Sequence, residues 1–121
     1  MEAILKTMDN TGTDLSASDG LFVKNNAGVL VLATAATDDV VGVITRGGLT
    51  QSDICLFGKC NVKAGAAITK YAQLTATTGG KALTETAGAR HIVALALEGA
   101  TAVDQLIEIM FYGGTSAEFA A

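Results

Sequence analysis

The side chains that could carry out chemistry are few, and the first to test is the single histidine, His91. A histidine acts as a general base beside a nucleophilic Ser or Cys, usually with an acid that orients its ring. His91 instead precedes an apolar run at residues 92–97, and the sequence contains no GxSxG nucleophile motif. We therefore expect no catalytic residue and no enzymatic activity.

The two cysteines, Cys55 and Cys60, and the adjacent acids Asp38 and Asp39 are the remaining candidates for ligand chemistry. A zinc site needs further ligands that one histidine does not supply, and a calcium loop needs alternating carboxylates. Cys55 lies inside the apolar run at residues 54–57, which favours a buried thiol. We expect no metal site, and a solvated turn at the two aspartates.

Glycine pairs at residues 47–48, 79–80 and 113–114 could suggest phosphate-binding loops. Such loops need the order GxxxxGK[ST] followed by a helix, and neither accompanies these pairs. Turn glycines are the better interpretation, so the sequence predicts no cofactor.

Charge restricts the possible partners. The net charge is −4, and no two Lys or Arg residues are adjacent. Binding to nucleic acid needs clustered cations that displace counterions, so we expect no nucleic-acid partner and no membrane-surface partner. No apolar stretch approaches the roughly 20 residues of a membrane-spanning helix, and the first residues lack the order of a signal peptide. We expect a soluble protein made in the cytoplasm.

Short β-rich runs separated by Gly, Asn and Asp turns make up most of the chain. Any functional site would lie on these strands or on the turns between them. This spacing predicts an all-β fold, a compact small barrel or sandwich of clip-like type. The runs are residues 28–32, 40–45, 53–57, 91–97 and 106–112, and the turn signals lie at 25–28, 37–39, 46–48, 78–80 and 113–114.

An internal comparison supports two similar β units. Shifting the chain by 52 residues, from Gly28 to Gly80, aligns the two halves without a gap and repeats the same order of turns and apolar runs. We place the units at about residues 21–58 and 73–110. Residues 101–110 could instead form a short helix, because Thr101 could cap it, so we allow at most one short helix.

The domain organisation follows from the polar, turn-rich ends. We expect one β domain at residues 21–114, a C-terminal tail at 115–121 and an N-terminal arm at 1–20, because such ends often become ordered only on binding. The residues of this arm that we expect to contact a partner are Met1, Glu2, Ala3, Ile4, Leu5, Lys6 and Thr7.

Two sets of motifs resemble the head decoration and capsid cement proteins of tailed phages. The first set is Val40-Val-Gly-Val-Ile44 and Ile54-Cys-Leu-Phe-Gly-Lys59, and the second is Ala96-Leu-Glu-Gly-Ala100 and Leu106-Ile-Glu-Ile109. The resemblance covers residues 20–112, although Gly65-Ala66-Ala67 replaces the charged Gly-Asp step of the family. It implies a compact β fold in the virion, binding to the major capsid protein as a trimer or similar homo-oligomer, head stabilisation and no catalysis.

Two other classes remain open. The β pattern also suits an adhesin-like or carbohydrate-binding virion module, although such modules usually expose aromatic residues and the chain has only four Phe and two Tyr. Residues 62–74 are also similar to strand-glycine-turn segments of the accessory domains of sialic acid synthases, which would imply a small enzyme using His91.

Overall fold

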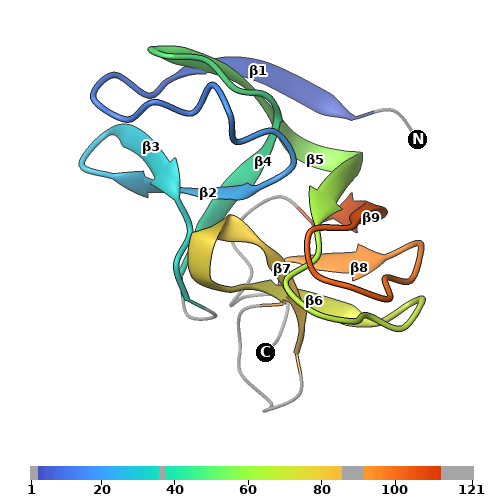
Figure 1. The fold of residues 1–121 in the computed structure, drawn as a ribbon. Coiled ribbons are helices and arrows are strands. Elements are labelled where there is room, and N and C mark those ends of the chain that lie inside the picture. The colour runs from blue at the N-terminus through green and yellow to red at the C-terminus, as the bar shows by residue number, and fades with distance from the viewer. Residues whose placement is uncertain (1–2, 36–37, 86–91, 113–121) are drawn as a thin grey trace.

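The computed structural model describes residues 3–35, 38–85 and 92–112, and this part of the chain is all β, as predicted. Nine strands form one curled sheet in the shape of a half-barrel (Figure 1). The strands are β1 (Ile4–Asp9), β2 (Phe22–Asn26), β3 (Val29–Leu32), β4 (Val40–Arg46), β5 (Gln51–Lys63), β6 (Gln73–Ala76), β7 (Ala82–Thr84), β8 (Ala94–Ala96) and β9 (Leu106–Phe111), and a 3-10 turn, η1 (Thr78–Gly80), lies between β6 and β7.

The long strand β5 divides the sheet into two units. Its first half, residues 51–57, lies between β1 and β4, whereas its second half, residues 58–63, pairs with β9. We call β1 to β4 with residues 51–57 unit A, and residues 58–63 with β6 to β9 unit B. The strand order is β3-β2-β4-β5-β1 in unit A and β7-β6-β8-β9-β5 in unit B, so the two orders are the same.

The turns of the two units are also alike. A shift of 52 residues places β2 on β6, β3 on β7 and β4 on β8. It also places Ala27 (φ 54°) and Gly28 (φ 88°) on Gly79 (φ 75°) and Gly80 (φ 77°). Two consecutive residues with positive φ form the type I′ turn that suits the twist of a two-residue β-hairpin. The turn predicted at residues 25–28 is therefore the tip of the β2–β3 hairpin.

Two hydrophobic clusters fill the molecule. The smaller one lies in unit A and is centred on Val23, Ile44 and Ile54. The larger one joins the opposite face of unit A, through Phe22 and Val43, to the interior of unit B. The core is mainly aliphatic and small, as the composition suggests, and its aromatic pair is Phe22 and Phe111, with ring centroids 6.2 Å apart.

The alternative of a helix at residues 101–110 is wrong. Residues 101–104 form a turn in which Asp104 has a φ of 68°, and Leu106–Phe111 is strand β9. Ile107, Ile109 and Phe111 alternate with more exposed residues, which is the period of a strand packed on one face. Burial of this alternating face outweighs the local preference for a helix.

The N-terminal segment, where we expected an arm at residues 1–20, contains a strand. Ile4–Asp9 forms β1, which pairs with β5 from Ile4↔Phe57 to Asp9↔Gln51. The connection to β2 is also fixed, because the Leu15 side chain enters the unit A cluster and Asn10 is buried. Met1 and Glu2 lie outside the described residues, as do residues 115–121 of the expected tail.

Candidate functional site: a notch between the two units

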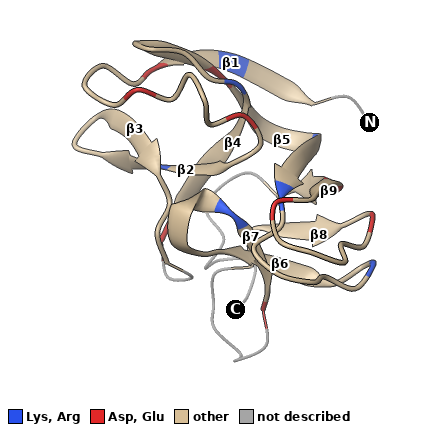
Figure 2. Cartoon of the chain, viewed as in Figure 1, with Lys and Arg blue, Asp and Glu red and all other residues tan. Residues whose placement is uncertain are grey.

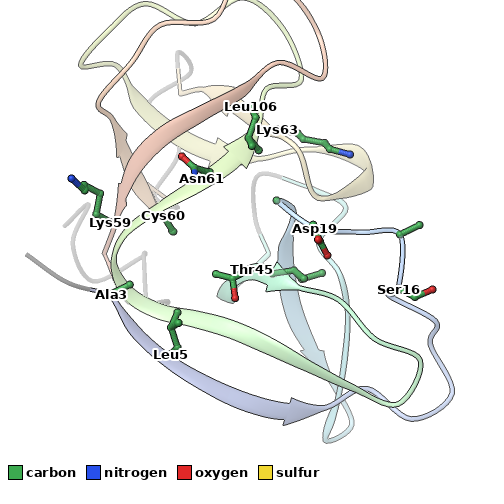
Figure 3. Close-up of a pocket in the computed structure, with 13 residues that line it drawn as sticks. Ala3, Leu5, Ser16, Asp19, Thr45, Lys59, Cys60, Asn61, Lys63 and Leu106 are labelled. Atoms are coloured by element: carbon green, nitrogen blue, oxygen red, sulfur yellow. The ribbon is translucent and has the colours of Figure 1, made fainter.

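A hollow in the described part of the chain lies where β5 bends between the two units. We call it the notch; its volume is about 620 Å³. Ala3, Leu5, Cys60 and Leu106 provide apolar lining, and Asp19, Lys59, Asn61 and Lys63 provide polar lining. Figure 3 shows Asn61 and Lys63 on one arm of the bent strand and Leu5 near the other arm.

The bend itself depends on Gly58, which has a φ of 109°. Before the bend, the odd-numbered residue Cys55 faces the large cluster, whereas after it the even-numbered residues Cys60 and Val62 do. An extra residue in a strand changes which side chains face inward, as in a β-bulge. Gly58 thus lets one strand serve as the last strand of unit A and the first of unit B.

The notch exposes the edge of a β-strand. The main-chain N–H of Lys63 donates to the Gly20 carbonyl (2.7 Å), on the side of β5 opposite β9. Because main-chain groups alternate along a strand, those of Lys59 and Asn61 point the same way, into the notch. Within the described residues, no strand pairs with residues 59–62 on this side. Among the described residues, the notch therefore offers main-chain donors and acceptors that have no strand partner.

Two lysines, Lys59 and Lys63, and one aspartate, Asp19, are the charged residues that line the notch. Lys59 forms an ion pair with Glu108 (3.6 Å), but both side chains remain substantially exposed. Asp19 has a structural contact, since its Oδ1 accepts a hydrogen bond from the Gly47 N–H (2.6 Å). Elsewhere on the described chain, Lys and Arg positions are scattered and do not gather on one element (Figure 2).

Exposed aliphatic side chains adjoin the notch. Ile4 and Leu5 on the edge strand β1 are 58% and 55% exposed, and Leu106 at the start of β9 is 54% exposed. Leu5 and Leu106 both line the notch. Of the arm residues selected from the sequence, Ala3 and Leu5 reach this site, whereas Lys59, Asn61 and Lys63 were not anticipated. Their only sequence signal is the alternation of polar and apolar residues after Gly58.

The cysteines are free thiols, and both are buried, as expected for Cys55. The Cys55 thiol donates to the Phe57 carbonyl and the Cys60 thiol to the Gly58 carbonyl. The interaction with the Cys55 thiol, followed by burial, raises the pKa of Cys60 above its ordinary value. The same interaction lowers the pKa of Cys55, against the opposing effect of burial. Both thiols pack in the large cluster, and Cys60 also contributes to the lining of the notch.

Asp38 closes a turn. Its Oδ2 accepts hydrogen bonds from the main-chain N–H groups of Thr34 (2.7 Å) and Ala35 (3.1 Å) and pairs with Lys24 (3.2 Å). Burial raises the pKa of Asp38, but the hydrogen bonds from Thr34 and Lys24 outweigh it and hold the pKa below its ordinary value. The carboxylate is therefore part of the fold and not of a calcium loop.

A buried polar network was not predicted. The Asn10 Nδ2 donates to the carbonyls of Thr13 (2.7 Å), Gly48 (3.0 Å) and Leu49 (3.3 Å), and its Oδ1 accepts from the Ser52 hydroxyl (2.8 Å). These bonds fasten the end of β1 to the β4–β5 hairpin. Sequence reasoning missed them because the partners are 38 to 42 residues away, apart from Thr13.

The other features considered in the sequence are metal ligands, membrane spans, the glycine pairs and His91. No group of three His, Cys, Asp or Glu side chains suited to a metal occurs in the described ranges. No helix in that part of the chain is long and apolar enough to cross a membrane. Gly47, Gly48, Gly79 and Gly80 lie in or beside turns, while His91 and the pair at 113–114 lie outside the described residues.

Comparisons with known proteins identify the fold. No family model matches the sequence, and no curated protein matches it. Among solved structures, the chain is similar to the N base of the head fiber protein gp8.5 of bacteriophage phi29, with a TM-score of 0.67 and 20% sequence identity. The match covers 94% of this chain and 98% of that chain. The two chains therefore share one fold over nearly their whole length.

Proposed function

We propose that this chain is a structural protein of a bacteriophage head, where it decorates the outer capsid surface as a cement protein. The supporting observation is its fold likeness to a head fiber base over 94% of the chain. The sequence resemblance to capsid decoration proteins supports the same location from different data. In this proposal the partner is the major capsid protein, the chain acts as a small homo-oligomer such as a trimer, and it catalyses no reaction.

The contact surface in this proposal is the outer side of β1. Ile4 and Leu5 expose more than half of their surface on a strand that pairs with β5 on one side. Fully burying one such side chain contributes about 1.5–3 kcal/mol, so the remaining area of these two gives weak binding per copy. Many copies on one shell, or several in one oligomer, would convert weak contacts into stable attachment.

The test is binding to capsids that lack the protein. Purified chain is added to unexpanded and expanded capsids, and bound copies are counted after sedimentation. We expect saturable binding, which Ile4→Ser and Leu5→Ser should weaken. Leu49→Ser is the matched control, since Leu49 is 66% exposed outside β1. Absence of binding to every capsid state would contradict the proposal.

A second candidate is binding of a carbohydrate, which a smaller hollow favours. Phe57, Gln73, Ile92 and Tyr112 line a space of about 350 Å³. Aromatic rings beside an amide are the groups that orient a small polar ligand in a site. Titration with a panel of host cell-wall glycans, monitored by tyrosine fluorescence and repeated with Tyr112→Leu, would reveal such binding. No response from the unmodified chain to any glycan would exclude this candidate for that panel.

A further inference from the structure

We propose that the notch binds residues 113–121 of a second copy of this chain, which add a short strand to the exposed edge of β5. This inference concerns self-association and does not depend on the proposed capsid binding. It combines three properties of the notch, namely its main-chain groups, its two-sided lining and its position relative to the end of β9.

The main-chain groups select an extended segment. The N–H and C=O groups of Lys59 and Asn61 face the notch, and the edge ends where Lys63 bonds to Gly20. An extended segment can pair with such an edge by β-augmentation, in which main-chain hydrogen bonds give affinity and alternate side chains give specificity. A helix or a small ion would leave most of these groups unpaired.

The side chains that line the notch suit the sequence of residues 113–121. Residues 113–121 read GGTSAEFAA and contain one charged side chain, Glu118, and one large apolar side chain, Phe119. Neighbouring residues of a strand point to opposite faces. When Phe119 lies on the face of Cys60, Glu118 therefore lies on the opposite face, with Lys59, Lys63 and Leu106.

The position of the segment favours a second copy. Phe111 pairs with Gly58 on the β9 side of β5, whereas the notch is on the other side. The Tyr112 N–H then donates to the Val93 carbonyl (2.9 Å), so the described residues end beside the start of β8. Nine further residues span at most about 30 Å when extended, which is long enough to reach a neighbouring copy. That neighbour's segment can enter the notch without crossing β5.

Self-association of the full chain provides the first test, measured by light scattering over a concentration series. We expect Phe119→Ser and Asn61→Pro each to weaken association by about tenfold or more, as for central interface residues. Proline at position 61 removes the N–H that faces the notch without breaking the β5–β9 pairing, and circular dichroism checks the fold. Asn61→Ala is the matched control and should associate normally, because it keeps that N–H.

Charge exchange provides a second arm. Lys63→Glu should weaken association, and adding Glu118→Lys in the same chain should restore it. Lys70→Glu, at an exposed lysine outside the notch, should leave association unchanged.

A photo-cross-link identifies the occupant. Phe119 is replaced by benzoylphenylalanine in unlabelled chain, which is mixed with excess ¹⁵N-labelled unmodified chain. Cross-links from position 119 to labelled peptides containing residues 3–5 or 59–63 are the expected result. Cross-links only within the unlabelled chain would overturn the second copy as occupant. A monomeric wild type, or normal association of both Phe119→Ser and Asn61→Pro, would overturn the proposal itself.

Discussion

Cys55 and Cys60 lie on the same strand at an odd spacing, yet both side chains enter the large hydrophobic cluster and their thiols interact. In a regular strand, residues at odd spacing point to opposite faces. The contact between the two thiols therefore reports the change of face at Gly58. It marks the point where unit A passes into unit B.

The first prediction concerns this change of face. Gly58→Ala should lower the free energy of unfolding by about 1–3 kcal/mol, because a side chain is strained at a φ of 109°. Urea unfolding followed by circular dichroism measures the change. Lys59→Ala, at the next position on the same strand, should have a much smaller effect. Equal stability of Gly58→Ala and the parent chain would show that the bend does not need glycine.

The second prediction concerns the buried amide of Asn10. Asn10→Ala should destabilise the fold by about 2–4 kcal/mol, because it leaves buried carbonyl groups and the Ser52 hydroxyl without a partner. The midpoint of thermal unfolding provides the measurement. Asn26→Ala, at an exposed position, should change stability by less than about 0.5 kcal/mol. Similar effects of the two substitutions would argue against a fastening role for Asn10.

The third prediction separates two reasons for glycine. A Cβ at Gly42 would meet the Ile54 side chain and the Cys55 carbonyl oxygen (2.5 Å), whereas one at Gly28 would meet nothing within 4 Å. Gly42→Ala should therefore cause severe destabilisation, about 3 kcal/mol or more, because the strands must separate. Gly28→Asn should change stability by less than about 1 kcal/mol, since Asn tolerates the positive φ of a type I′ turn. Parallel chemical unfolding of both variants distinguishes them; equal losses would contradict the packing argument.

The fourth prediction concerns pH. The folded pKa of Asp38 is below its ordinary value of 3.8, so its ionised form stabilises the fold above that pH. This contribution is lost as the pH falls through the lowered folded pKa. Asp38→Asn should therefore reduce stability at pH 7 by about 1–3 kcal/mol. Unfolding at several pH values should show the difference between the two chains shrinking under acid conditions; a constant difference would contradict the charge-based explanation.

Much of the fold could be predicted from the sequence. Strands β3, β4 and β9 and the first half of β5 are continuous β-rich runs bounded by turn residues, and those turns recur after 52 residues. The predicted units at 21–58 and 73–110 nevertheless omitted their first strands. In β1 most side chains are exposed, and the second half of β5 follows the bend at Gly58, so neither has the pattern of a separate buried strand.

The candidate site was harder to predict. Leu5 was selected as part of a terminal arm, but its neighbours Lys59 and Leu106 come from strands far along the chain. Only pairing of those strands brings the three residues to one hollow. The spacing of residues in the sequence does not indicate that these three residues lie together. The sequence pattern of an exposed strand lysine is the same whether or not it lines a notch.

The sharing of β5 also governs the order in which the protein can fold during synthesis. β1 is made first, but its hydrogen-bonded partner Asp53 lies 46 residues beyond Thr7. The earliest strand must therefore remain unpaired until most of unit A has left the ribosome, and unit B cannot begin until that same partner strand continues past Gly58. Contacts of such long range slow folding and leave β1 accessible to other chains, so the yield on expression should depend on how fast β5 follows β1.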